Sequence, residues 1–323
     1  MIIVTTACNQ SETETRTAQN YSESIATPDW YNASSFDTVK VLSWNVEHFV
    51  DDFDNPYIQN RRENEPSEEL KKRRTLLAEA IKRADADIVI LQEIESQSFV
   101  QQFAETYLSE MGYQAFVAAE SPDWYMNVVA MSRIPLGMTY SYANAHTSYQ
   151  EESDDDSTKM EEKIQNFTNN RMWSVDVLVN PEYSFTLTAV HLKAGRGERN
   201  ASWRTGQMSL LRSFLAQMLQ INPQRNFLIA GDFNATPESE EIQYLLGNES
   251  DRLSFIDPLA GTNIHSHPSD STFWRIDHIL PDKNMFPEVV NGQTQVIKPM
   301  AGDTMAQISD HLPLMVKIVA EDQ

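Results

Sequence analysis

The feature that most constrains the fold of this chain is a set of short apolar runs that carry a polar residue at one end. The clearest is "LIAGDFNATPES" (228–239), where an apolar run reaches Gly231 and then presents Asp232 and Asn234 before Pro237. Because side chains alternate across a strand, Asp232 and Asn234 share one face. This run therefore predicts a buried strand that delivers an acid and an amide to one place at its end.

Five further runs have the same character. Their polar residues stand where a predicted strand begins or ends, at Asn45 in "VLSWNVEHF", Glu93 in "DIVILQEI", His191 in "TLTAVHL", Asp277 in "FWRIDHIL", and Asp310 and His311 in "DHLPLMVKI". Burying a charge without a partner is costly. The runs are therefore expected to converge, so that these groups lie against one another and against a cation.

The net charge limits the partners that this chain can hold tightly. It has 25 Lys and Arg against 47 Asp and Glu, a formal net charge of -22 at pH 7, which repels nucleic acid and anionic membranes at long range. A nuclease is not excluded, because metal ions held by acidic residues can bring a phosphate into a local site. The single cysteine excludes an internal disulfide and a paired-thiol metal or redox motif.

The N-terminal segment, residues 1–36, lacks periodicity and is expected to be a disordered tail. In "IVTTACNQSETETRTAQN", small residues lead into Cys8 and a polar stretch follows. That order resembles the end of a bacterial lipoprotein signal, although the charged start and the full apolar core are missing. Two interpretations stay open: export in a bacterium with a lipid anchor at Cys8, which we favour, and a tail that carries a chance cysteine. No run approaches the roughly 20 apolar residues of a membrane span.

Residues 37–323 are expected to form one α/β domain. Two strand-like runs separated by a break at Asn180 should pair antiparallel, and the charge run at 150–163 should be a solvated loop. Strand pairs with segregated helices suggest sheets packed face to face with helices outside. The helices are expected at 67–85, 98–112 and 200–221.

Together these motifs resemble a known family. The stretches "SWNVEHF", "LQEI", "HLKAG", "GDFNATPES", "RIDHIL" and "SDHLPL" occur in the order, and at roughly the separations, of the endonuclease/exonuclease/phosphatase superfamily of DNase I-like, metal-dependent phosphohydrolases. The resemblance covers about residues 39–319, and the motifs in register are far more specific than any one of them. It implies a four-layer α/β sandwich, in which two mixed β-sheets pack face to face with helices on both outer sides.

The resemblance also implies hydrolysis of a phosphate ester by in-line attack of water, assisted by Mg²⁺ or Mn²⁺, with Ca²⁺ as a further candidate. Glu93 is expected to be the principal metal ligand, with Asn45 and Asp310 nearby, and such oxygen donors suit a hard divalent cation. Asp232, with Asn234 beside it, is expected to orient and deprotonate water or to serve a second metal.

Two histidines have roles that the sequence leaves open. His311, if protonated, would stabilise charge on the phosphoryl oxygens, with Asp277 as its carboxylate partner. His191 could donate a hydrogen bond to the phosphate or protonate the leaving oxygen. Lys193 and Arg204 belong to a local basic cluster and are candidate phosphate contacts, with a solvated loop as the alternative.

Some residues close to these motifs are weaker candidates for contact with the site. Glu47, His48 and His278 are expected to be mostly structural. Trp203 and Trp274 could stack on a base, but tryptophans in or beside strands more often belong to the core or its rim. Trp203 is the likelier exception of the two, because it precedes Arg204.

The substrate is the least determined part of the function, because loops outside the motifs set specificity. "GDFNATPES" and "HLKAG" look most like secreted bacterial nucleases, which favours a monomeric nuclease of low sequence specificity. A sphingomyelinase- or phospholipase C-like enzyme would need an exposed apolar hairpin, and none is evident in the sequence. A phosphatase acting on another phosphate ester is a further alternative. A non-catalytic binding protein on the same scaffold would predict loss of Glu93, Asp232 or His311, and all three are present.

Overall fold

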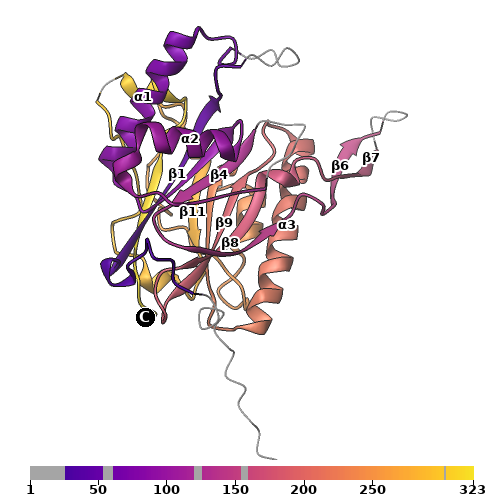
Figure 1. The fold of residues 1–323 in the computed structure, drawn as a ribbon. Helices are drawn as coiled ribbons and strands as arrows, with labels where there is room; N and C mark the ends of the chain where they lie inside the picture. The colour runs from indigo at the N-terminus through magenta and orange to yellow at the C-terminus, as the bar shows by residue number, and fades with distance from the viewer. Residues whose placement is uncertain (1–25, 54–60, 120–125, 154–158, 302) are drawn as a thin grey trace, which may run out of the picture.

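The computed structural model describes residues 26–53, 61–119, 126–153, 159–301 and 303–323. They form two large mixed sheets that pack face to face (Figure 1). The first sheet contains, in spatial order, β12 (Gln295–Val296), β13 (Leu314–Val319), β1 (Thr38–Phe49), β2 (Ile88–Ile94), β4 (Asn127–Ser132) and β3 (Ala115–Ala118). The second contains β11 (Asp277–Pro281), β10 (Asn226–Asp232), β9 (Ser184–His191), β8 (Met172–Leu178) and β5 (Leu136–Ser141).

Helices cover both outer faces, so the predicted four-layer α/β sandwich is confirmed. The α-helices are α1 (Ser67–Ala84), α2 (Gln97–Tyr107), α3 (Glu198–Ile221), α4 (Glu240–Leu246) and α5 (Thr304–Ile308). Short 3-10 helices lie at η2 (Ala33–Ser35), η3 (Ser109–Met111), η4 (Asn169–Arg171) and η5 (Phe286–Glu288). Among the described residues, no helix is both long and apolar enough to cross a bilayer.

Alternation along the strands decides which apolar layer each side chain fills. Val41 of β1 belongs to the layer between the two sheets, whereas its neighbour Leu42 packs toward α1 and α2. On the second sheet, Leu228 of β10 faces the inner layer and Ile229 packs toward α3 and α4. Because both faces of the central strands are buried, their sequences are continuous apolar runs instead of alternating ones.

The strand register brings the polar ends of these runs to one edge of the sandwich. β1 and β2 run parallel, and Asn45 pairs with the residue before Glu93. β9 and β10 also run parallel, with His191 opposite Asp232. β11 runs antiparallel to β10, so its first residue, Asp277, pairs with Asp232. Parallel strands end where their antiparallel neighbours begin, and this places the acids, the amide and the histidine together.

Part of the charge run at 150–163, expected to be a loop, forms a strand pair. β6 (Thr147–Glu152) and β7 (Met160–Gln165) pair antiparallel and project from the body beside α3 (Figure 1), while residues 154–158 lie outside the described part of the chain. Tyr149 of β6 stacks on Trp203 of α3, with ring centroids 4.2 Å apart. The expectation of a loop was wrong because charged strands with solvated side chains can still pair their backbone groups in a ladder.

The described part of the expected tail packs on the domain. Tyr31 stacks on Phe36 with centroids 5.4 Å apart, and its hydroxyl donates to the carbonyl of Val179. Both rings pack against the apolar layer between the sheets. This packing corrects the expectation of a disordered tail for residues 26–36. Residues 1–25 lie outside the described residues, so the lipid anchor at Cys8 and export of the protein stay predictions.

We expect Tyr31→Ala to lower the free energy of unfolding by about 2 kcal/mol, because it removes a half-buried ring and a hydroxyl donor. Urea unfolding followed by circular dichroism measures this difference. Ser35→Ala is the matched control, since Ser35 is exposed in the same segment and should shift stability by no more than about 0.5 kcal/mol. Equal stability of the two variants would show that residues 26–36 contribute nothing to the domain.

Candidate active site

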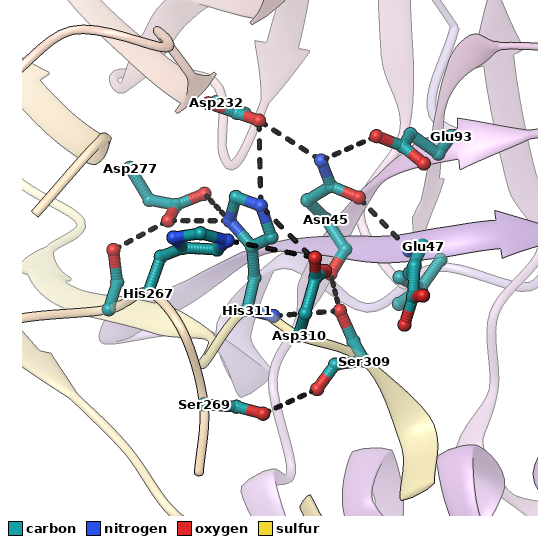
Figure 2. A network of polar contacts seen from close by, with 12 residues as sticks. Asn45, Glu47, Glu93, Asp232, His267, Ser269, Asp277, Ser309, Asp310 and His311 are labelled. Atoms are coloured by element: carbon teal, nitrogen blue, oxygen red, sulfur yellow. Dashed lines mark hydrogen bonds and ion pairs between the residues drawn. The ribbon is translucent and has the colours of Figure 1, made fainter. Parts of the chain in front are cut away.

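Polar side chains from both sheets meet at this edge (Figure 2). Nδ2 of Asn45 donates to Oε1 of Glu93 at 3.1 Å and to Oδ2 of Asp232 at 3.0 Å. Asn45 and Glu93 come from β1 and β2, whereas Asp232 comes from β10. The Asn45 amide therefore joins the ends of the two sheets, and it brings together three residues that stand in separate runs of the sequence.

The turns that carry these residues have backbone conformations that are rare outside glycine. The backbone angle φ is positive at Glu47 (48°), His48 (48°), Glu93 (62°) and Asn234 (52°). Such conformations cost about 1–3 kcal/mol each and persist where surrounding contacts hold them. The bent backbone supplies donors to the carboxylates, because the His48 N–H donates to Glu93 at 3.0 Å and the Asn234 N–H donates to Asp232 at 2.8 Å.

Gly231 is required by the close approach of β9 and β10. A Cβ atom at this position, where φ is 153°, would lie 1.9 Å from the carbonyl oxygen of Val190. A side chain would push the two strands apart where they deliver His191 and Asp232. Glycine in "GDFN" therefore keeps two site residues in register. Beyond Asp232, the Nδ2 of Asn234 donates to the carbonyl of Leu192 at 3.1 Å and ties the two strand ends together.

His311 forms a buried pair with Asp277. Its Nδ1 lies 2.9 Å from Oδ2 and 3.1 Å from Oδ1 of that carboxylate, which also accepts a hydrogen bond from the Ser266 hydroxyl at 2.6 Å. Burial alone would lower the pKa of His311, but Asp277 and, more distantly, Asp232 outweigh burial and raise it to about 10. His311 is therefore a cation at neutral pH, with Nδ1 donating to Asp277 and Nε2 left to donate elsewhere.

His191 has the opposite protonation state. Its Nε2 lies 3.8 Å from Oδ2 of Asp232 and 3.9 Å from Oε1 of Glu93. Burial lowers the pKa of His191 well below its usual value, and the nearby Arg171 guanidinium acts in the same direction. His191 is therefore neutral. The two imidazoles that the sequence left interchangeable differ because only His311 has a carboxylate within hydrogen-bond distance.

Asp310 lies at the outer rim of the site, beside a histidine that the sequence reasoning missed. Its Oδ2 is 3.6 Å from Nε2 of His267, and its Oδ1 is 3.9 Å from Nε2 of His311. The two imidazole rings have centroids 4.7 Å apart. His267 stands in an irregular loop with no apolar run, so no local pattern could have identified it. Pairing of Ser269 N–H with the Asp310 carbonyl at 2.7 Å brings the two loops together.

Arg73 of α1 supports the backbone segments that carry the site residues, and no feature of the sequence identified it as a site residue. It is 3% exposed, and its guanidinium donates to the carbonyls of Val46, Glu47 and His48 at the end of β1. It also donates to the carbonyl of Ile308 at 2.8 Å, just before Asp310 and His311. Burial is the main cause that lowers the pKa of Arg73 to about 10. One side chain thus ties the end of β1 to the end of α5, which directly precedes Asp310 and His311.

The two residues predicted to contact phosphate, Arg204 and Lys193, do not belong to the cluster around Asn45. The Arg204 guanidinium is buried and donates to Glu241 at 3.0 and 2.7 Å and to the carbonyls of Lys193 and Gly195. Its ion pair with Glu241 leaves it no role at the surface, so the assignment of Arg204 as a phosphate contact is corrected. Lys193 is half-buried, and its ammonium lies 5.5 Å from the centroid of the Trp203 ring.

The neighbours expected to be structural also find partners. Glu47 pairs with Arg61 and Arg62 at 3.1 and 2.6 Å. His278 is buried and contacts the Ala235 carbonyl at 2.9 Å, which agrees with a structural role. His48 lies closer to the candidate metal ligands than expected, because its Nε2 is 3.5 Å from Oε2 of Glu93.

The donor set fits a hard divalent cation. The carboxylates of Glu93 and Asp232 converge on the Asn45 amide, and Asp310 adds a carboxylate at the rim; hard cations prefer such oxygen ligands. The Asn45 Oδ1 accepts from the Glu47 N–H at 3.0 Å, so its NH₂ group faces the two carboxylates. Burial raises the pKa of Asp232 above the usual range of an aspartate even though His311 opposes the shift. A bound cation would favour the charged form of Asp232 and so offset the effect of burial.

In the part of the chain that the structure describes, two groups have possible ligand atoms that all lie within 4.8 Å of one another: one contains His267, Asp310 and His311, and the other Asp232, Asp277 and His311. His311 belongs to both. A protonated imidazole is not a metal ligand, so we expect the carboxylates of these groups to do the binding. The ligand set of Glu93, Asn45 and Asp310 stays a prediction.

A model of the Endonuclease/Exonuclease/phosphatase family matches residues 42–311. A comparison with curated protein sequences found no match.

Several solved structures share this architecture at low sequence identity. The human Nocturnin catalytic domain with bound sulfate anion is 19% identical, with a TM-score of 0.56 and coverage of 87% of this chain and 94% of that chain. Truncated TDP2 from Caenorhabditis elegans is 14% identical, with a TM-score of 0.57 and coverage of 88% and 99%. An endonuclease/exonuclease/phosphatase family protein from Bacteroides thetaiotaomicron is 13% identical, with a TM-score of 0.55 and coverage of 87% and 94%. At these identities the likeness concerns the fold.

Proposed function

The chain belongs to the endonuclease/exonuclease/phosphatase family, whose members hydrolyse phosphate ester bonds, and from this premise we propose that it is a divalent-metal-dependent phosphodiesterase that cleaves nucleic acid with low sequence specificity. Two histidines in opposite protonation states flank Asp232, and this arrangement carries the proposal. Oδ2 of Asp232 lies 3.8 Å from Nε2 of the neutral His191 and 3.9 Å from Nε2 of the cationic His311. Hydrolysis of a phosphate ester needs a base for water and donors for the phosphoryl and leaving oxygens.

The metal would be held by Glu93, Asn45 and Asp310, with Mg²⁺ as the proposed ion and Mn²⁺ or Ca²⁺ as alternatives. When bound, the ion supplies positive charge to the phosphoryl oxygens and lowers the pKa of nearby water. The strained turns that carry Glu93 and His48 orient the carboxylate before substrate arrives.

The side chains of this protein do the proton transfer. Asp232, whose pKa burial raises, accepts the proton of the attacking water. His311 donates from Nε2 to a phosphoryl oxygen, while Asp277 holds its other nitrogen. His191, whose ring is neutral, donates a hydrogen bond from its N–H to the leaving oxygen, and solvent water supplies the proton that this oxygen takes up. An in-line attack then needs the water and the leaving oxygen on opposite sides of the phosphorus.

A nucleic-acid substrate is supported by the loop that follows β9. It carries Lys193 and Arg196, two basic residues in a protein of net charge -22, whereas the nearby Arg199 belongs to α3 and pairs with Glu151 at 2.5 Å. Its first residues follow His191 directly, so this pair begins beside the catalytic edge. Local positive charge attracts a phosphate backbone even where the whole surface is acidic.

A lipid phosphodiester is the second candidate, because the structure contains an exposed apolar hairpin that was not evident in the sequence. On β7 and the turn after it, Met160, Ile164 and Phe167 are 46%, 70% and 63% exposed. Apolar side chains on a projecting hairpin can insert into a lipid interface. Glu161 and Glu162 lie on the same strand and oppose binding to anionic lipids.

Hydrolysis of double-stranded DNA, single-stranded RNA, sphingomyelin and a small phosphomonoester, assayed in parallel with Mg²⁺, Mn²⁺, Ca²⁺ or chelator, tests the proposal. We expect nucleic-acid cleavage that chelator abolishes. A Glu93→Gln preparation purified in the same way controls for contaminating nuclease and should be inactive. Activity confined to sphingomyelin or to the monoester would replace the nuclease proposal, and no activity on any substrate would favour a binding protein.

A further inference from the structure

His267 faces a candidate metal ligand at the rim of the site (Figure 2). Its Nε2 lies 3.6 Å from Oδ2 of Asp310, whereas Oδ1 of the same carboxylate faces Nε2 of His311 at 3.9 Å. A distance of 3.6 Å is too long for a hydrogen bond. It is nearer to the separation of about 3 Å between neighbouring ligand atoms of an octahedral ion with bonds of about 2.1 Å. A small shift would therefore let His267 and Asp310 share one cation.

The ring nitrogens of His267 are not committed to other groups of the protein. Among the described residues, Nδ1 is buried and makes no hydrogen bond, and Nε2 has Asp310 as its carboxylate neighbour. His311 differs, because Asp277 lies 2.9 Å from its Nδ1 and holds it as a cation, which cannot bind a metal. Buried polar atoms without a partner are uncommon in folded proteins. His267 therefore has ligand capacity that the protein itself does not use.

The imidazole of His267 is held in place and is still accessible to an ion. Reciprocal backbone hydrogen bonds join His267 and Trp274 at 3.0 and 2.9 Å. Their rings are nearly parallel, with an interplanar angle of 6° and centroids 6.2 Å apart. The His267 side chain is 23% exposed and that of Asp310 is 48% exposed. An ion can therefore reach the pair from solvent, and little ordering of the imidazole is needed on binding.

We propose that Nε2 of His267 is a further ligand of the metal ion held by Asp310, and that this nitrogen raises the affinity of the site for Mn²⁺ relative to Mg²⁺ and Ca²⁺. Mg²⁺ and Ca²⁺ prefer oxygen ligands, whereas first-row transition ions also accept imidazole nitrogen. Mg²⁺ can still bind through the oxygen donors of the site, so the nitrogen changes the preference between ions. The assignment rests on the proposed metal-dependent function, and it adds a ligand that lies outside the sequence motifs.

Pulsed electron paramagnetic resonance of Mn²⁺ bound to the full-length protein detects nitrogen atoms that are coordinated to the ion. We expect the couplings of an imidazole nitrogen in wild-type protein and their loss in His267→Ala. Calorimetric titration should show that His267→Ala binds Mn²⁺ about 10- to 100-fold more weakly, the usual effect of disturbing the shell of a metal site, while the affinity for Mg²⁺ changes much less. His267→Gln, which offers an amide oxygen, should retain part of the Mn²⁺ affinity without the nitrogen couplings.

His265→Ala is the matched control on the same loop. His265 lines an adjoining aromatic cavity of about 380 Å³, to which Phe273 and Trp274 also contribute, and the variant should keep the couplings and affinities of wild-type protein. Mn²⁺-loaded wild-type protein without nitrogen couplings, or couplings that persist in His267→Ala, would overturn the assignment. Nitrogen couplings without hydrolysis of any substrate in the parallel assay would keep the ligand and remove the proposed function. Chelator-sensitive hydrolysis without nitrogen couplings would remove the ligand and keep the function.

Discussion

Replacing His311 with alanine is expected to lower the turnover number by about 10²- to 10⁴-fold, the usual effect of removing a positioned proton donor. The imidazolium is held by Asp277 on one side and faces Asp232 and the phosphate edge on the other. Because its charge would act on the phosphoryl oxygens in the transition state, the loss should fall on kcat more than on KM. Steady-state kinetics on the substrate found by the parallel assay measure both.

His146→Ala is the matched control, since His146 is exposed and lies outside the site. It should leave turnover unchanged. A His311→Ala variant with near-normal kcat and an intact fold would remove His311 from the chemistry.

The protonation of His311 also makes stability depend on pH. Its pKa is about 10 in the folded protein, against about 6.5 in an unfolded chain. Because the folded pKa is the higher one, the stabilising contribution is complete below about pH 6.5 and is lost as the pH rises toward about 10. In chelator, the free energy of unfolding of wild-type protein should therefore fall across this window more steeply than that of His311→Ala. Parallel curves from urea unfolding would contradict the ion pair with Asp277.

Replacing Arg73 with methionine is expected to lower the free energy of unfolding by about 3–5 kcal/mol, because it leaves several buried carbonyl groups without donors. The guanidinium contacts the carbonyls of Val46, Glu47 and His48 and that of Ile308, so the change loosens the end of β1 and the end of α5 at once. Where the variant stays folded, the Mg²⁺ concentration that gives half-maximal activity should rise, since the Glu93 carboxylate depends on the same turn.

Lys72→Met is the matched control on the same helix. Lys72 is exposed and makes one surface ion pair with Glu69 at 3.7 Å, so the change should cost no more than about 1 kcal/mol. Arg73→Lys provides a second test if the methionine variant fails to fold. An ammonium cannot span both segments with the fixed fork of a guanidinium, so we expect an intermediate stability. Wild-type stability in Arg73→Lys and in Arg73→Met would show that Arg73 does not hold the site.

Elements with strong local patterns could be predicted from the sequence. The helix expected at 67–85 is observed as α1, and the antiparallel pair expected around Asn180 is observed as β8 and β9. Amphipathic spacing and apolar runs are properties of residues that are close in the sequence, so they can be recognised from the sequence alone. The pair β6 and β7 has no such pattern, because most of its side chains are charged or exposed and only a few, such as Thr147 and Tyr149, pack toward the body.

The candidate site could be predicted only in part, because burial separates residues that look alike in the sequence. Arg73 and Arg204 both stand in helices among other charged residues, yet one lies under the site and the other is paired with Glu241. His267 lies in a loop and reaches the site through pairing with Trp274. The positions of these three side chains cannot be predicted from the few residues on either side of them in the sequence.

The sequence by itself determined which strands carry acids, amides and imidazoles at their ends. Together with the order of the family's motifs, this predicted that one edge of the sandwich holds the active site of a phosphate-ester hydrolase. Those positions are set by local hydrophobicity and by the order of motifs. The tertiary structure alone decided that His311 is charged and His191 neutral, that Arg73 ties the end of β1 to the end of α5, and that an aromatic cavity adjoins the site. Each of these depends on distances between segments far apart in the chain, because Coulomb interactions, desolvation and hydrogen bonds act through space and not along the sequence.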